Sequence, residues 1–271
     1  MDFLNKKSNL INETIRVAQH AGTIVLEIYN QSGNFFKLKE DNSPLTKADT
    51  ASNNYIVNQL KNITPDIPIL SEEEKSIPLS VRSEWKEYWL IDPLDGTKEF
   101  IKRNGEFTVN IALIRNNRPI FGVIDIPTKQ QTFWGAKDLG SFMLGNNKEK
   151  KKLKVSANEG QKIKILTSRT HPGFENLIIE EIDNVELIVA GSSMKFCLIA
   201  NGVADGYIRL GPTSEWDIAA GEAIVKFAGG ITVDIENRDI IYNKSDNLIN
   251  PHFVVTTNNK LANKLLKLIN R

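Results

Sequence analysis

Two short acidic segments contain the residue types of this sequence that could do chemistry. Glu72 and Glu73 end one short apolar run, and Asp92 and Asp95 end another. Carboxylate oxygens without histidine or cysteine beside them suit magnesium rather than zinc or copper. Because protein-bound magnesium works mainly on phosphate groups, the two segments indicate phosphoryl chemistry. On spacing alone, a solvent-exposed acidic turn is the alternative.

The segment from Asp92 to Thr97 has a backbone suited to such a site. Proline disfavours a helical conformation in the residue before it, so Asp92 should stay extended at the end of its strand. Asp95 follows across a turn that can bring both carboxylates to one side. Gly96 permits close backbone approach, and Thr97 stands where the next helix would begin, with N–H groups able to receive an anion.

Strands must place these acids at one rim of a sheet, where ligands bind in α/β folds. The runs 67–70 and 88–91 are predicted as those strands. Apolar residues from Ile11 to Tyr29 recur at helical spacing and predict a first helix, and a second helix is predicted over about 48–60. The remaining predicted elements are a hairpin of 107–115 and 119–126, strands over 130–136, 162–167, 186–190, 204–210 and 253–256, and helices after 191–193, over 215–228 and over 261–268. This alternation predicts a layered α/β protein.

A lysine-rich stretch over 146–154 interrupts the pattern. No aromatic residues alternate with its lysines, as they would in a surface that stacks nucleic-acid bases, so we interpret it as an exposed connector. We place a domain boundary just beyond this connector. The chain is therefore predicted to form an N-terminal α+β unit over 1–157 and a C-terminal α/β unit over 158–271.

Composition narrows the classes of function. The 271 residues include 34 Lys and Arg and 33 Asp and Glu, a net charge of +1 that offers no field for a nucleic-acid polymer or a membrane surface. The single cysteine, Cys197, cannot form an internal disulfide, and we interpret it as a core residue in a protein of a reducing compartment. No apolar run reaches 18 residues, so no transmembrane segment is expected. We therefore expect a cytoplasmic protein.

Several segments, in the same order along the chain, resemble the superfamily of lithium-sensitive, magnesium-dependent phosphatases that includes the inositol monophosphatases. These are 43–49 (SPLTKAD), 70–73 (LSEE), 88–110 (YWLIDPLDGTKEFIKRNGEFTVN), 191–197 (GSSMKFC), 211–213 (GPT) and 216–221 (WDIAAG). Within the longest, Lys98 to Ile101 is similar to the CysQ-type branch, the 3'(2'),5'-bisphosphate nucleotidases. The resemblance spans essentially the whole chain. It implies an inositol monophosphatase/fructose bisphosphatase-like sandwich of five layers, α/β/α/β/α.

The resemblance also implies a set of metal ligands. Glu72 and the Leu94 carbonyl would bind a first Mg²⁺, Asp92 would bridge to a second, and Asp95 and Asp217 would hold the second. A third, weaker ion would lie near Glu72 and Glu73. On the residues alone, a helix cap is the favoured interpretation of Asp217, and only the resemblance makes it a metal ligand.

The implied catalytic residues are Asp49, Glu73 and Thr97. Thr97, oriented by Asp49, would help a metal-activated water attack the phosphorus, with Glu73 assisting through its own water. Without the resemblance, Asp49 is equally a first-turn helix acid. Its neighbours Lys47, Thr50 and Ser52 are expected to point outward.

Substrate contacts are implied on both sides of the metals. Lys195 and Arg209 would bind a second, non-reacting phosphate, although either could be a surface residue, and His171 could be a plain loop residue. The implied substrate-binding set is Glu72, Leu94, Asp95, Gly96, Thr97, His171, Ser193, Lys195, Arg209 and Asp217.

The expected activity is removal of the 3'-phosphate from adenosine 3',5'-bisphosphate to give AMP, which in the family recycles a by-product of sulfate assimilation. An inositol or sugar monophosphate phosphatase on the same fold is the nearest alternative. A non-catalytic metal or nucleotide sensor is the alternative from another class. A monomer or a homodimer, and a peripheral position at the inner membrane face, are both compatible with the sequence.

Overall fold

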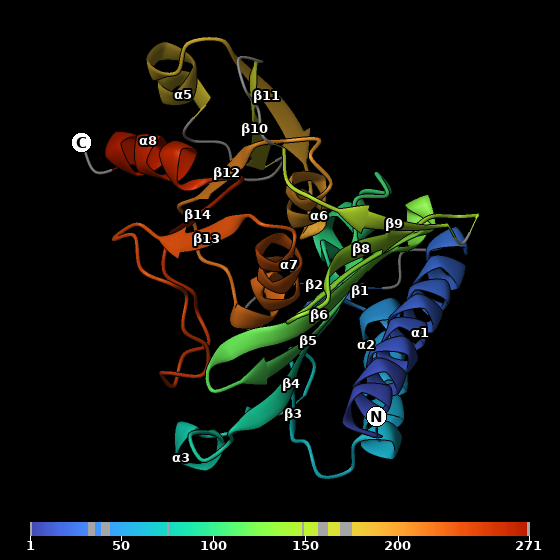
Figure 1. Ribbon diagram of the computed structural model, residues 1–271. Coiled ribbons are helices and arrows are strands. Elements are labelled where there is room, and N and C mark those ends of the chain that lie inside the picture. The colour runs from blue at the N-terminus through green and yellow to red at the C-terminus, as the bar shows by residue number, and fades with distance from the viewer. Residues whose placement is uncertain are drawn as a thin grey trace.

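Two β-sheets alternate with three helical layers (Figure 1). In this computed structural model the described residues are 2–31, 36–38, 44–74, 76–147, 149–156, 162–168 and 175–269. Helices cover the outer face of each sheet, and further helices fill the space between the sheets. The predicted five-layer sandwich is confirmed.

The larger sheet has seven strands in sequence order. Its strands are β3 (Ile69–Ser71), β4 (Glu87–Asp95), β5 (Thr108–Arg115), β6 (Arg118–Ile126), β7 (Gln131–Ala136), β8 (Gly140–Leu144) and β9 (Lys150–Leu153). Only β3 and β4 run parallel, so their carboxyl ends, which carry the two acidic segments, meet at one rim. A register shift between Asp92 and Asp95 bends the end of β4 there.

The smaller sheet has the order β11-β10-β12-β14-β13. Its strands are β10 (Ile163–Ser168), β11 (Val185–Ala190), β12 (Gly206–Arg209), β13 (Ile231–Asp234) and β14 (Phe253–Thr256). Strands β11, β10 and β12 are parallel, and the other pairs are antiparallel. A short pair, β1 (Phe36–Leu38) and β2 (Pro44–Thr46), lies apart from both sheets.

The helices divide among the three layers and their edges. They are α1 (Asp2–Asn30), α2 (Lys47–Ile63), α3 (Leu79–Arg82), α4 (Thr97–Ile101), α5 (Glu175–Glu181), α6 (Met194–Ala200), α7 (Glu215–Phe227) and α8 (Asn259–Ile269), with a 3₁₀ turn at Pro127–Lys129. Helices α1 and α2 pack on the large sheet, α6 and α7 lie between the sheets, and α5 and α8 cover the small sheet.

Packing follows the predicted helical pattern. In α1, Ile11, Ile15, Ala18 and Val25 are buried against the large sheet. On the opposite face, a Cβ at Gly122 would lie 2.4 Å from the Ala220 carbonyl oxygen, so α7 contacts β6 backbone to backbone. This close packing holds the first turn of α7 near the rim of the large sheet.

The prediction of an exposed connector over 146–154 is wrong for Lys150–Leu153, which form the edge strand β9 paired with β8. Lysine side chains on an edge strand face solvent while the backbone pairs, so composition alone did not reveal the strand. The Lys150 ammonium lies 4.8 and 4.1 Å from the ring centres of Trp134 and Phe142. Elements β1, β2, α3, α5, β8 and β13 were not predicted either.

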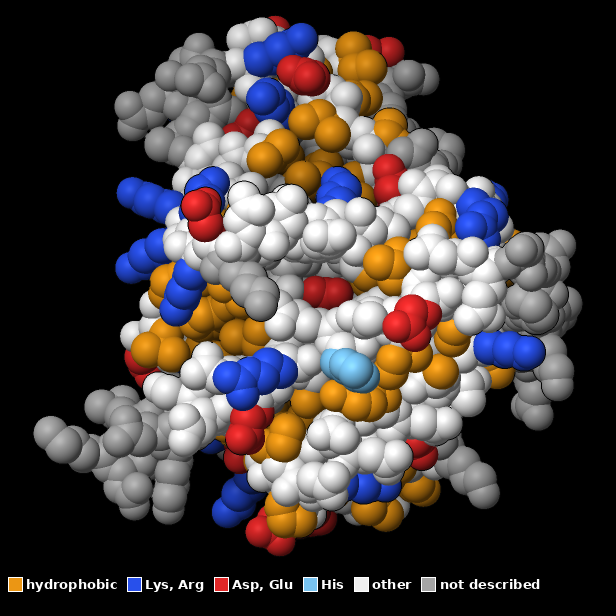
Figure 2. All heavy atoms as spheres, turned by 90° about the vertical axis from the view of Figure 1, so that its right-hand side faces the viewer, with side chains coloured by type: hydrophobic (Ala, Val, Ile, Leu, Met, Phe, Trp, Pro, Cys, Tyr) orange, Lys and Arg blue, Asp and Glu red, His pale blue; other side chains and the backbone are white. Residues whose placement is uncertain are grey.

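The surface carries both signs of charge. Figure 2 shows Lys and Arg side chains interspersed with Asp and Glu on the face covered by α1 and α2, as the near-zero net charge predicts. Within the described part of the chain, no helix combines the length and apolar character needed to cross a bilayer.

Candidate active site

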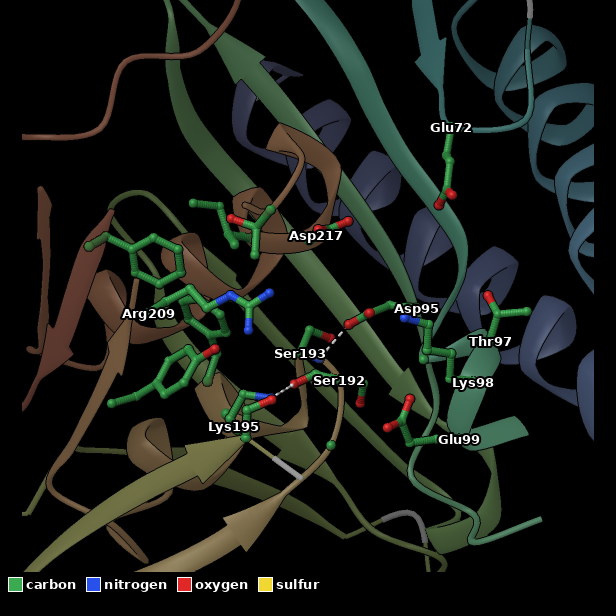
Figure 3. Close-up of a pocket in the computed structure, with 18 residues that line it drawn as sticks. Glu72, Asp95, Thr97, Lys98, Glu99, Ser192, Ser193, Lys195, Arg209 and Asp217 are labelled. Atoms are coloured by element: carbon green, nitrogen blue, oxygen red, sulfur yellow. Dashed lines mark hydrogen bonds between the residues drawn. The ribbon is translucent and has the colours of Figure 1, made fainter. Parts of the chain in front are cut away.

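A cleft of about 280 Å³ opens where the end of β4 meets α6, β12 and α7. From the first half of the chain it is lined by Glu72, Asp95, Gly96 and Thr97, and from the second half by Ser193, Lys195, Arg209 and Asp217. Figure 3 shows the carboxylates of Glu72, Asp95 and Asp217 pointing toward a shared space from three different elements. The structure thus brings together residues that the sequence places up to 145 positions apart, from Glu72 to Asp217.

The acids of the cleft disfavour one another's charge. Burial raises the pKa of Asp92, which is only 1% exposed, and Glu72, Asp95 and Asp217 raise it further. The pKa of Asp217 is also raised, by burial and then by Asp95 and Glu72. No three of the described Asp, Glu, His or Cys side chains lie close enough, as they stand, to hold an ion. The acids face one another across the cleft, where a divalent cation would relieve their repulsion.

Local hydrogen bonds fix the turn that carries Asp92 and Asp95. The Leu94 N–H donates to Asp92 Oδ1 at 3.0 Å, and Ser52 Oγ donates to the Pro93 carbonyl at 2.8 Å. Gly96 has a φ of +90°, and a Cβ there would lie 2.9 Å from the Glu106 carbonyl oxygen. Position 96 therefore requires glycine. The sequence had predicted that Gly96 permits another stretch of backbone to approach closely.

Asp49 both caps a helix and lies next to Thr97, as the two interpretations of this residue from the sequence require. It caps α2, because its Oδ2 accepts the Thr46 N–H at 2.8 Å and the Thr46 hydroxyl at 2.5 Å. Its Oδ1 lies 3.4 Å from the Thr97 hydroxyl, which also lies 3.2 Å from the Leu94 carbonyl oxygen. Burial raises the pKa of Asp49 to about 6 against the opposing effect of the Thr46 hydrogen bonds, and the charge of Glu73 raises it further. Asp49 can therefore take up a proton near neutral pH.

Asp217 likewise caps its helix and faces the cleft. The Ser214 N–H donates to Asp217 Oδ2 at 2.8 Å at the start of α7. Figure 3 shows its carboxylate pointing toward Asp95 and Glu72. The helix-cap interpretation of Asp217 is therefore confirmed by a hydrogen bond, and the same side chain also faces the cleft.

The opposite wall of the cleft holds two cations that are buried, not surface residues. Lys195 is 5% exposed, and Arg209 is 9% exposed. Lys195 Nζ donates to the Ser192 carbonyl at 2.7 Å and lies 3.3 Å from the Ala190 carbonyl. Burial lowers the pKa of Lys195 to about 8, against the opposing effect of Asp95. Arg209 Nη2 donates to the Pro212 carbonyl at 2.9 Å, whereas its buried Nε has no hydrogen-bond partner among the described residues.

The chain matches known proteins over nearly its whole length. Residues 6–271 match the model of the inositol monophosphatase family. The chain belongs to that family. It is 39% identical over 249 residues to the 3'(2'),5'-bisphosphate nucleotidase CysQ of Salmonella typhimurium, covering 91% of this chain and 99% of that protein. It is 44% identical over 232 residues to the protein of the same name from Buchnera aphidicola, covering 82% and 83%.

A solved structure agrees with the sequence comparison. The crystal structure of CysQ from Bacteroides thetaiotaomicron, a bacterial member of the inositol monophosphatase family, superposes with a TM-score of 0.82. The two chains are 39% identical, and the match covers 93% of this chain and 98% of that one. Membership of the inositol monophosphatase family makes the chain a phosphatase that depends on a divalent metal.

The acidic wall of the cleft consists of Glu72, Asp95 and Asp217, with the buried Asp92 next to them. This wall fits a divalent cation. Its acids supply hard oxygen ligands, and their mutually raised pKa values record repulsion that a bound cation would remove. Among the described residues, no His or Cys side chain lines the cleft, so the donor set of this part of the chain suits magnesium.

Sequence reasoning missed three polar residues around the site. Ser52, expected to point outward, is instead fully buried and holds the Pro93 carbonyl. Asn53 Oδ1 accepts the Ser71 hydroxyl at 2.7 Å, and Asn53 Nδ2 donates to Glu74 Oε1 at 3.0 Å, so α2 also holds the first acidic segment. Ser192 lines the cleft with a φ of +46°. The feature that singles out Ser192 is its left-handed backbone angle, and nothing in the sequence indicates that angle.

One further predicted substrate contact, Ser193, makes its side-chain hydrogen bonds inside the protein, and the other, His171, is not described. Ser193 is 2% exposed, and its hydroxyl lies 2.7 Å from Thr108 Oγ1 and donates to Asn110 Oδ1 at 2.8 Å, so it is engaged inside the protein. His171 lies outside the described residues. Cys197 is fully buried in the core, as expected.

Proposed function

We propose that this phosphatase is a 3'(2'),5'-bisphosphate nucleotidase that hydrolyses adenosine 3',5'-bisphosphate to AMP and phosphate with Mg²⁺. The supporting observation is the two-sided cleft, in which buried Lys195 and Arg209 face the acidic wall. A monophosphate needs only the metal side, whereas a bisphosphate presents a second anion that needs cations of its own. Arg209 Nε, which donates to no group of the described residues, is a donor suited to such an anion.

The proposed ligands are Glu72, Asp92, the Leu94 carbonyl, Asp95 and Asp217, which would hold two Mg²⁺ ions, with a third near Glu72 and Glu73. When bound, the ions supply Lewis acidity that neutralises phosphoryl oxygens and acidifies water. The protein's part is to hold the phosphate beside Gly96 and Thr97, at the end of β4 where the backbone turns closely.

Proton transfer falls to Asp49 and Thr97 in this proposal. The Thr97 hydroxyl can donate to Asp49 Oδ1 and accept from an attacking water at the same time. As the water loses its proton to Thr97 Oγ1, the Thr97 proton passes to Asp49, whose raised pKa suits an acceptor near neutral pH. Glu73, whose charge raises the pKa of Asp49, would assist through a second water.

The same proposal covers organisation and setting. We place the boundary between the two units at 157/158, a position outside the described residues, with the active site built from both units. The proposed localisation is the cytoplasm, because a single cysteine suits a reducing compartment. The role would be recycling of the nucleotide by-product of sulfate assimilation.

The first test measures phosphate release with Mg²⁺ from adenosine 3',5'-bisphosphate and from inositol 1-phosphate under identical conditions. We expect strong preference for the nucleotide. Preference for inositol 1-phosphate would keep the metal chemistry and replace the proposed substrate by a monophosphate. No release from either would favour a metal or nucleotide sensor.

A further inference from the structure

The turn between β11 and α6 holds a backbone conformation that needs support. Ser192 has a φ of +46°, a left-handed conformation that side-chain-bearing residues disfavour. The turn is bracketed by hydrogen bonds from outside its own backbone. Lys195 Nζ donates to the Ser192 carbonyl at 2.7 Å, and the Gly191 N–H donates to Glu106 Oε2 at 2.8 Å.

The same turn aims one N–H group at a proposed metal ligand. The Ser193 N–H donates to Asp95 Oδ2 in a short hydrogen bond (Figure 3). The Ser193 side chain is fixed at the same time, because its hydroxyl is bonded to Thr108 and Asn110 on β5. One carboxylate oxygen of Asp95 is thereby held by the second half of the chain, which sets the direction of the other oxygen.

We propose that Lys195 is a positioning residue for Asp95. By holding the Ser192 carbonyl, its ammonium keeps the left-handed turn, and the turn keeps the Ser193 N–H on the Asp95 carboxylate. Lys195 thus acts on the metal side of the cleft through the single planar peptide group that joins Ser192 to Ser193, in addition to any contact with a distal phosphate. The inference rests on the proposed role of Asp95 as a metal ligand.

Charge and positioning predict opposite outcomes when Lys195 is replaced. If Lys195 acted only by its charge, Lys195→Met would tighten Mg²⁺ binding, because a cation near Asp95 is removed. If Lys195 positions Asp95, the same variant binds Mg²⁺ more weakly, because the carboxylate loses its fixed direction. By analogy with groups that orient metal ligands, we expect weakening of about tenfold.

The experiment is calorimetric titration of the metal-free full-length protein with Mg²⁺ alone, without nucleotide. The variants are Lys195→Met, the double variant Lys195→Met/Ser192→Gly, and Arg209→Met as the matched loss of a second buried cation of the cleft. Glycine adopts the left-handed turn without support, so the double variant should regain most of the Mg²⁺ affinity. Arg209→Met should not weaken Mg²⁺ binding, because Arg209 does not contact the turn.

The outcomes separate this inference from the proposed substrate. Unchanged or tighter Mg²⁺ binding in Lys195→Met overturns it, and so does a double variant no better than the single one. If Lys195→Met does not fold, Lys195→Gln, which keeps one amide donor, should show a smaller loss that Ser192→Gly again repairs. Failure of the wild type to hydrolyse the bisphosphate would refute the proposed function and leave the Mg²⁺ comparison standing.

Discussion

The two walls of the cleft are built on opposite principles. The acidic wall gathers carboxylates whose burial and mutual repulsion raise their pKa values, so it is electrostatically unfavourable until a cation arrives. On the distal wall, two buried cations rest on backbone carbonyls and face carboxylates such as Asp95. The first wall therefore depends on its ligand, whereas much of the second is held by the protein itself.

Removing one acid should distinguish the walls most clearly. Asp95→Asn takes away a ligand charge and should lower kcat by roughly 10³-fold or more with every phosphate substrate. Steady-state phosphate release at saturating Mg²⁺ measures it. Glu84→Gln, the same change at an exposed position, is the control and should keep full activity. Near-normal turnover by Asp95→Asn would remove Asp95 from the acidic wall's function.

Replacing Asp49 tests whether the acidic wall also handles the proton. Asp49→Asn should lower kcat by about 10²-fold, the usual contribution of a general base. In the wild type, activity should fall as the pH drops through about 6, because Asp49 must be ionised to accept a proton and burial raises its pKa to about 6. A pH profile of kcat measures both effects. A variant that keeps the same acidic limb would assign that limb to another group.

The distal wall should affect binding, with little effect on turnover. Arg209→Met should raise KM for adenosine 3',5'-bisphosphate by about 10- to 100-fold, the loss expected for charge-assisted hydrogen bonds to phosphate. KM for a monophosphate should change far less. Arg238→Met, at an exposed arginine paired with Asp234 and Glu236, is the matched control. Equal KM changes for both substrates would place the second phosphate elsewhere.

The smallest expected effect concerns stability. In a carboxyl group whose pKa is raised by folding, the protonated form is favoured in the folded state, so stability is greatest below the unfolded pKa and falls as pH rises through the folded one. Asp49, with a pKa raised from 3.8 to about 6, and the acids facing the cleft share this sign. Urea unfolding in chelator should give a free energy of unfolding at least about 1.4 kcal/mol higher at pH 5 than at pH 8, the equivalent of one pKa unit. With Mg²⁺ present, the difference in the free energy of unfolding between pH 5 and pH 8 should shrink. A larger difference with Mg²⁺ than in chelator would contradict repulsion among the acids.

The sequence predicted the acidic wall better than its support. Acids at strand ends and the turn at Pro93 and Gly96 are local features, visible in a few consecutive residues. Ser52 and Asn53 were missed because their partners, the Pro93 carbonyl and Ser71, are set by how α2 packs on β3 and β4. The alternation of elements predicted a layered α/β protein, and the family resemblance implied its five layers. Strand β9 was missed because pairing with β8 overrides its lysine-rich composition.

The two aspartates that cap helices have a consequence for how the site is assembled. Asp49 is bonded to Thr46 and Asp217 to Ser214, each three residues earlier at a helix start. Each half of the chain therefore orients one acid within a single helical turn, before any distant contact is needed. Joining the halves then brings together two side chains whose directions are already set locally, so this part of the proposed catalytic centre is preorganised by the starts of α2 and α7.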